Sequence, residues 1–364
     1  MDRGTWAKRA GLAAMSTFVC LLGAEGVVRV AGIDAPRWAH ANHLESEDKR
    51  TVVDAYPDDP RSYFDLDLSR RDIRSRWTAL GVPRLAEVAS RTPHAVGLRF
   101  DEHLCRSDSG EEPAGVARVL VVGDSFTEGQ GVRGPDTFSA HLDRGLGEGV
   151  DVVNCGRRGY DFPALADTFP SRLDAYEPDL VVYAMVLNDA QRSDAFSARQ
   201  RYLDDWIVDR RRMLADGEPR ARWRSRLWDV LVDRVEGFRV GNETTQWYLD
   251  MYGRENAAGW AATQDHIAGM GAAASARGAD FVVVLLPLLV QLDGTYAFEP
   301  LSPIIAGALA ERGVPFHDTT PALLGRPTAP LWVHPMDRHP NERAHQIIAD
   351  DLQPVIAAML GARS

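Results

Sequence analysis

Short apolar runs and longer amphipathic runs alternate along the chain from residue 117 onward. Five runs predict strands, the first of them nearly all apolar, at 117–123, 150–154, 179–187, 280–286 and, more weakly, 314–317. Helical patterns accompany them at 137–146, 163–176, 259–277, 304–312 and 341–360. This alternation predicts an α/β fold in which helices cover both faces of a parallel sheet. Such sheets carry their functional sites at the carboxyl ends of the strands.

One segment interrupts the alternation. Residues 190–257, between the third and fourth predicted strands, are charged, rich in Arg and punctuated by tryptophans. Because the segment is too long for an ordinary connection, we predict a helical insertion in the main domain at 116–362. Its pattern fits a lid or partner surface as well as it fits a solvated helical elaboration.

The first 33 residues predict a signal peptide or membrane anchor. Arg3, Lys8 and Arg9 precede an apolar run at 10–24, which is the pattern of an export signal. A buried amphipathic helix is the alternative, since about 20 apolar residues are needed to span a bilayer comfortably. We expect attachment to a bacterial cell membrane, facing the periplasm or exterior, or secretion after cleavage. Residues 34–115 are irregular and polar and predict an extension leading to the main domain.

Composition and charge narrow the class of protein. The chain has 364 residues, of which 45% are hydrophobic and 26% charged, as in an ordinary globular protein. Its net charge of -11 argues against nucleic acid as a partner, because nucleic-acid-binding surfaces are usually basic. Cys20, Cys105 and Cys155 form no zinc-binding spacing. Spacing does not show whether the last two pair, and we favour two free thiols.

Four groups of residues stand where the predicted fold would make them neighbours. Ser125 follows the first strand and opens a helix, whose N-terminal N–H groups favour developing negative charge. Gly159 follows the second strand, where glycine lets the backbone approach a ligand. Asn188 ends the third strand and could donate to an oxyanion. Asp337 and His339, two apart in an extended segment, project to one side. Singly, each group also fits helix capping, a turn or a surface position.

Taken together and in this order, the four groups resemble the SGNH/GDSL hydrolase family. The resemblance covers about residues 117–360. It implies a three-layer α/β/α sandwich of flavodoxin-like type, with a five-stranded parallel sheet and no cofactor. It also implies a Ser-His-Asp site with Ser125 as nucleophile, His339 as base and Asp337 as the acid that orients it. The oxyanion donors would be Gly159, Asn188 and the backbone N–H of Ser125.

The chain departs from the family pattern at two positions. Val186 stands where the family usually has glycine, which should affect packing more than chemistry. Asp337 lies two residues before His339, whereas the usual spacing is three, and some relatives that move acetyl groups on polysaccharides resemble this shorter form. Acyl transfer to a polysaccharide therefore stays open, as does a non-catalytic carbohydrate-binding or assembly protein of the same fold.

We expect a serine esterase that cleaves an ester, such as an O-acetyl group on a cell-envelope glycan or a lipid ester. A metal site made by His334, His339, His345 and Asp337 matches no standard spacing. The glycine-rich stretch 129–134 starts too far beyond the first strand for a dinucleotide site. We therefore predict neither a metal nor a cofactor, and we expect His345 to pack or hydrogen-bond behind the site.

Overall fold

The computed structural model of the protein describes residues 3–32, 100–106, 116–159, 162–199, 225–334 and 337–362. Five parallel strands form its central sheet, in the order β2-β1-β3-β4-β5. They are β1 (Ala117–Gly123), β2 (Val150–Gly156), β3 (Leu180–Val186), β4 (Asp280–Leu286) and β5 (Phe316–Asp318). Every residue of β3 is buried, as expected of a central strand in a sheet covered on both faces. The predicted five-stranded parallel sheet is confirmed.

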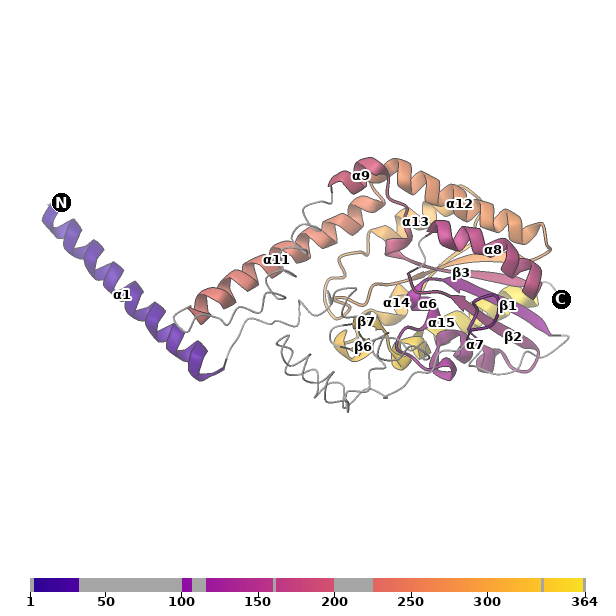
Figure 1. The fold of residues 1–364 in the computed structure, drawn as a ribbon, viewed down its shortest axis with the longest axis horizontal. Helices are drawn as coiled ribbons and strands as arrows, with labels where there is room; N and C mark the ends of the chain where they lie inside the picture. The colour runs from indigo at the N-terminus through magenta and orange to yellow at the C-terminus, as the bar shows by residue number, and fades with distance from the viewer. Residues whose placement is uncertain are drawn as a thin grey trace.

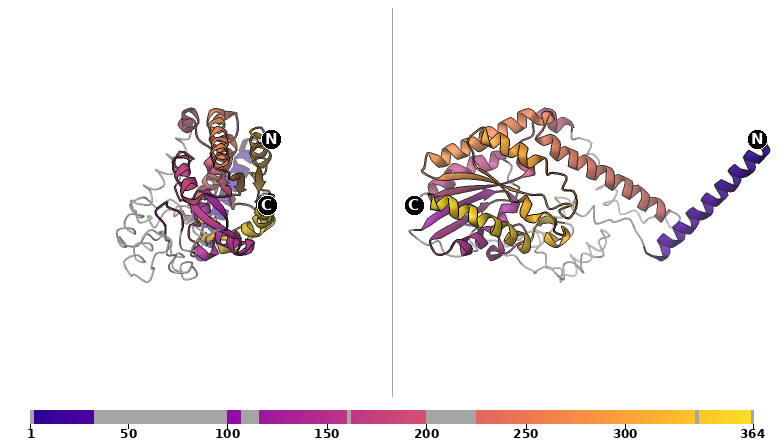
Figure 2. Two further views of the ribbon diagram at one scale, coloured as in Figure 1. Left: turned by 90° about the vertical axis from the view of Figure 1, so that its right-hand side faces the viewer. Right: turned by 180° about the vertical axis from the view of Figure 1, so that it is seen from behind.

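Helices form a layer on each side of the sheet (Figures 1 and 2). One layer holds α7 (Phe138–Leu146) and α15 (Glu342–Gly361), which pack against each other. The other holds α8 (Phe162–Tyr176), α12 (Ala257–Ser275) and α13 (Leu301–Ala310), with α12 in contact with both of its neighbours. The arrangement is the three-layer α/β/α sandwich that the resemblance implied.

Shorter elements connect these layers, and two long helices extend from them. The short helices are α6 (Ser125–Glu128), η1 (Gly134–Asp136), η2 (Leu187–Asp189), η3 (Arg254–Asn256), α14 (Thr320–Leu323) and η4 (Ala329–Leu331). A two-stranded antiparallel hairpin pairs β6 (Trp332–His334) with β7 (Asp337–Pro340). The predicted insertion holds α9 (Asp194–Arg199) and the long α11 (Arg226–Met251), while residues 200–224 lie outside the described part.

The N-terminal helix α1 (Arg3–Val30) extends away from the domain (Figure 1). Its segment Lys8–Val30 has a mean hydropathy of 1.7 and is long and apolar enough to cross a membrane. A signal sequence has the same properties, so the helix agrees with either form of the predicted N-terminal segment. Of the predicted extension at 34–115, only residues 100–106 are described.

A disulfide joins Cys105 to Cys155, so the prediction of free thiols was wrong. The two cysteines are 50 residues apart in sequence, and only the folded chain brings the segment 100–106 beside the end of β2. There the N–H of Arg106 donates to the carbonyl of Asn154 at 2.6 Å. Cys20 lies exposed on α1 as a free thiol.

Candidate active site

Ser125 is the first residue of α6, directly beyond the carboxyl end of β1. Asp124 caps this helix, and its side chain accepts the N–H of Phe126 at 2.9 Å. A side chain at Gly123 would overlap the hydroxyl of Thr127 and lie 2.7 Å from a carbonyl oxygen of β3. Only glycine therefore lets the chain turn this tightly from strand to helix, which places the Ser125 hydroxyl at the edge of the sheet.

His339 meets Ser125 across the site. The distance from His339 Nε2 to Ser125 Oγ is 2.8 Å, although the two residues are 214 positions apart. His339 lies on β7, and Asn341, two residues further along the chain, holds that strand in place. The Asn341 side-chain oxygen caps α15 by accepting two N–H groups, while Nδ2 donates to the carbonyls of Pro330 and Trp332. One amide thus ties the strand that carries His339 to the hairpin and to the last helix.

Gln130 is a site residue that the sequence did not reveal. Its Nε2 atom lies 3.4 Å from Nδ1 of His339, and its side chain is buried. The glycine-rich stretch 129–134 resembles part of a nucleotide-binding loop, and the one signal for Gln130 is its position five residues after Ser125. The backbone of Asp337 pairs with His334 in the hairpin, but the Asp337 side chain lies outside what the structure describes.

The three candidate oxyanion donors stand beyond the ends of three neighbouring strands. Ser125 follows β1, Gly159 follows β2 and Asn188 follows β3, and β1 lies between the other two. Gly159 has a φ of 74°, in the left-handed region, while no described atom lies within 4 Å of the place of its missing side chain. Conformation rather than crowding therefore favours glycine there. The Asn188 side chain lies near the carboxylate of Asp124 and lowers the pKa of that group.

A buried ion pair holds the loop after β2 against the helix of Ser125. Glu128 is fully buried, and its carboxylate accepts Nε of Arg158 at 2.6 Å and the backbone N–H of Arg158 at 2.9 Å. Arg106 donates to the carbonyls of Glu128 and Val132, each at 2.7 Å. Any side chain at Gly156 would overlap the backbone of α6. The pairing of Arg158 with Glu128 therefore ties the loop after β2 to α6.

Two buried carboxyl groups, those of Asp124 and Asp189, lie near Ser125. Asp189 accepts the hydroxyl of Tyr183 at 2.8 Å and the N–H of Val186 at 2.9 Å. Burial, and after it the charge of Asp124, raise the pKa of Asp189 well above its ordinary range. Burial also raises the pKa of Asp124, opposed by its hydrogen bonds and by the nearby His339. Of the two carboxyl groups, Asp189 therefore has the more strongly raised pKa.

His345 packs behind the site, as predicted. It is fully buried on α15, and its Nδ1 accepts the N–H of Phe138 at 3.0 Å. Its ring is stacked on that of Phe138, with 5.7 Å between centroids. Among the described residues no hydrogen-bond partner reaches its Nε2. Burial, with the charge of Arg106 as the next cause, lowers the pKa of His345 to about 3.

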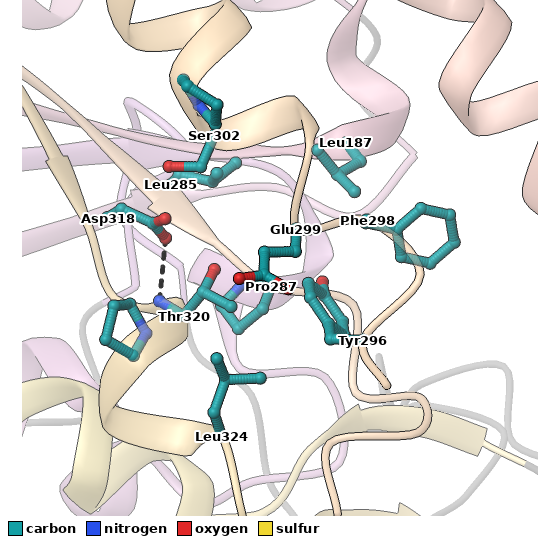
Figure 3. A pocket seen from close by; sticks show the side chains of 12 residues that line it. Leu187, Leu285, Pro287, Tyr296, Phe298, Glu299, Ser302, Asp318, Thr320 and Leu324 are labelled. Atoms are coloured by element: carbon teal, nitrogen blue, oxygen red, sulfur yellow. Dashed lines mark hydrogen bonds between the residues drawn. The ribbon is translucent and has the colours of Figure 1, made fainter. Parts of the chain in front are cut away.

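A pocket of about 320 Å³ opens at the carboxyl ends of β4 and β5 (Figure 3). Its apolar wall includes Leu187, Leu285, Pro287, Tyr296, Phe298 and Leu324. Its polar groups include Asp318, whose carboxylate accepts the N–H of Thr320 at 2.8 Å. Leu187 immediately precedes Asn188, so the pocket begins beside one of the candidate oxyanion donors. Within the described residues, no group of three His, Cys, Asp or Glu side chains is placed to hold a metal ion.

Comparison with known proteins agrees with this architecture. The GDSL-like lipase/acylhydrolase family matches the chain over residues 121–347, a range that includes every candidate site residue. No curated protein matches the chain.

Several solved structures are similar to this chain. A lipolytic protein of the G-D-S-L family from Desulfitobacterium hafniense is 15% identical, with a TM-score of 0.39 over 66% of this chain and 99% of its own. A carbohydrate acetylesterase family member from Sinorhizobium meliloti is 18% identical, with a TM-score of 0.35 over 68% of this chain and 100% of its own. The esterase EstA from Pseudoalteromonas sp. is 12% identical, with a TM-score of 0.40 over 67% of this chain and 98% of its own.

Proposed function

We propose that the hydroxyl of Ser125 is the nucleophile of this enzyme. The chain belongs to the GDSL-like lipase/acylhydrolase family and is an ester-hydrolysing enzyme. The 2.8 Å approach of His339 Nε2 to Ser125 Oγ carries this proposal. As Oγ attacks the ester carbonyl carbon, Nε2 takes the hydroxyl proton. The resulting imidazolium gives the proton to the departing alcohol and leaves an acyl group on Ser125. Water, deprotonated by the same Nε2, then releases the acid and restores the serine.

This cycle requires His339 to keep its other proton on Nδ1. In the sequence pattern Asp337 is the carboxylate that accepts a hydrogen bond from Nδ1–H, and we retain it in this role. Gln130 is a second candidate, because its amide lies 3.4 Å from Nδ1. Turned so that its oxygen faces the ring, the amide would accept a hydrogen bond from Nδ1–H and leave Nε2 free to act as a base.

The tetrahedral intermediate needs donors for its negatively charged oxygen. We assign this task to the backbone N–H of Ser125, the N–H of Gly159 and the side chain of Asn188. A side-chain amide has two N–H bonds, so Asn188 can face Asp124 with one and direct the other toward substrate. Such preorganised donors each contribute about 3–4 kcal/mol in known cases.

The substrate we propose is an ester of the cell envelope, either an O-acetyl group on a glycan or a lipid ester. The apolar pocket beside Asn188 has room for a small acyl or alkyl group. The Cys105–Cys155 disulfide is typical of proteins outside the reducing cytosol, which supports export. The short spacing between Asp337 and His339 leaves transfer of the acyl group to a sugar hydroxyl as the second candidate.

The test compares full-length Ser125→Ala with Ser171→Ala, which removes an exposed hydroxyl from α8. We expect p-nitrophenyl acetate turnover to fall at least about 10³-fold in the first variant and to stay unchanged in the second. A fluorophosphonate probe should label all forms except Ser125→Ala. Sugar acceptors added to the wild type distinguish transfer from hydrolysis by the product formed. Undiminished turnover by a folded Ser125→Ala protein would refute the assignment.

A further inference from the structure

Helix α11 carries four large apolar side chains on one exposed face. Trp228, Leu231, Val235 and Phe238 are 64%, 48%, 68% and 73% exposed, respectively. Their spacing of three, four and three residues places them along one side of the helix, and we call them the α11 stripe. Soluble surfaces seldom leave a contiguous row of such residues in water, so a covering surface is expected.

The stripe begins where α11 meets α1. The Glu25 carboxylate of α1 accepts the hydroxyl of Ser225 at 2.8 Å and the backbone N–H groups of Arg226 and Leu227 at 3.0 and 2.8 Å. It therefore caps the first turn of α11, where a negative charge is favourable. Val28, nearly one turn further along α1, is buried. From this junction α11 runs toward the α/β domain (Figures 1 and 2).

The junction has a defined depth if α1 crosses a bilayer. Lys8–Val30 has 23 residues, a length of about 34 Å at 1.5 Å per residue. Glu25 lies about 8 Å from the C-terminal end of that segment by the same rise. A headgroup layer is about 5–7 Å thick, so with Val30 at the outer surface of the headgroups Glu25 lies at about the boundary between headgroups and acyl chains. Trp228 follows within the first turn of α11 and is held at the same level.

We propose that the α11 stripe lies in the surface of the membrane that α1 crosses, as a second contact between the protein and the lipid. Tryptophan is favoured at the headgroup level, and Phe, Leu and Val on one face suit the acyl boundary. Arg234 and Arg239 are exposed and fall on either side of the stripe at 100° per residue. Arg239 also pairs with Glu243 at 2.8 Å. Arginines in these flanking positions can reach lipid phosphates.

The contact would fix how the catalytic domain faces the membrane. Figure 1 shows β7, which carries His339, and α6, which carries Ser125, on the side of the domain nearer to α1, with the C-terminus on the far side. The proposed active site would then face substrates at the membrane surface. This last consequence rests on the proposed function, whereas the lipid contact does not.

The test uses the full chain in nanodiscs of phosphatidylcholine and phosphatidylglycerol, with an NBD fluorophore on one cysteine at a time. Cys20 labels α1 directly, since Cys105 and Cys155 are joined. In a Cys20→Ser background, Val235→Cys and Phe238→Cys label the stripe, and Ala272→Cys labels an exposed position on α12 as the control. Nitroxide lipids then report which labels touch the bilayer.

We expect a nitroxide near the headgroups to quench most fluorescence at positions 235 and 238, and one deep in the chains to quench Cys20. Position 272 should be unaffected. Quenching at Cys20 alone would overturn the proposal. Stripe labels whose fluorescence is blue-shifted but not quenched by any nitroxide lipid would also overturn it, because a second copy or another part of the chain would then cover the stripe. An unquenched Cys20 would also overturn it, because α1 would lie outside the bilayer. Ester hydrolysis, measured in the same samples, can fail without changing any of these outcomes.

Discussion

The buried His345 is expected to make the fold sensitive to acid, and His345→Gln should remove that sensitivity. Burial lowers the pKa of His345 from 6.5 to about 3 in the folded protein, whereas the unfolded chain keeps the ordinary value. Between these two values the unfolded state binds a proton that the folded state excludes. The stability that depends on neutral His345 is therefore complete above pH 6.5 and is lost as the pH falls toward 3.

The size of the effect follows from the difference between the two pKa values. Each pH unit in this window costs about 1.4 kcal/mol, so the group accounts for about 2 kcal/mol between pH 6.5 and 5 and about 5 kcal/mol in full. Glutamine does not titrate, and its side-chain oxygen can still accept the N–H of Phe138. The variant should therefore lose stability less steeply as acid is added.

Urea unfolding of the full chain in mild detergent, followed from pH 7.5 to 4.5, measures the difference between wild type and His345→Gln. Other titrating groups are common to both proteins and cancel in that difference. Phe138→Leu is the control, because it removes the stacked ring and lowers stability at every pH but leaves His345 buried. It should keep the slope of the wild type. Parallel curves for wild type and His345→Gln would refute the reasoning.

Three further expectations concern the supports of the site. Gly156→Ala should destabilise the fold by several kcal/mol, because the added methyl group would overlap the α6 backbone. Gly159→Ala should cost only about 1–2 kcal/mol, because alanine tolerates the left-handed φ of that position poorly. Thermal unfolding compares the two variants, and equal losses of stability would contradict the geometry. The Cys105–Cys155 disulfide closes a loop of 50 residues, so its reduction should lower the free energy of unfolding by about 4 kcal/mol. Urea midpoints with and without reductant measure this loss, and an unchanged midpoint would count against it. Gln130→Leu should lower kcat for p-nitrophenyl acetate more than it changes KM. Gln130→Glu should retain more activity, because its carboxylate can still accept a hydrogen bond from Nδ1–H of His339. Equal kcat for both variants and wild type would remove Gln130 from the mechanism.

The sequence by itself determined the helices and strands and the edge of the sheet that carries the candidate site. Strands β1 and β4 lie where the apolar runs placed them, because a strand buried on both faces needs an unbroken apolar run. The order of strand and helix restricts the topology to a parallel sheet. Polar residues and glycines just beyond apolar strands then mark the candidate site, since the carboxyl ends of parallel strands lie along one edge.

Only the tertiary structure decided which distant residues meet. Local periodicity says which face of an element is buried but not what it is buried against. The contact of Gln130 with His339, the pairing of Cys105 with Cys155 and the capping of α11 by Glu25 all join segments far apart in the chain. Each depends on packing of the whole domain or of its long helices. The hydrogen bond from Ser125 to His339 belongs to the same class, because the sequence supplied both groups and the fold supplied the 2.8 Å between them.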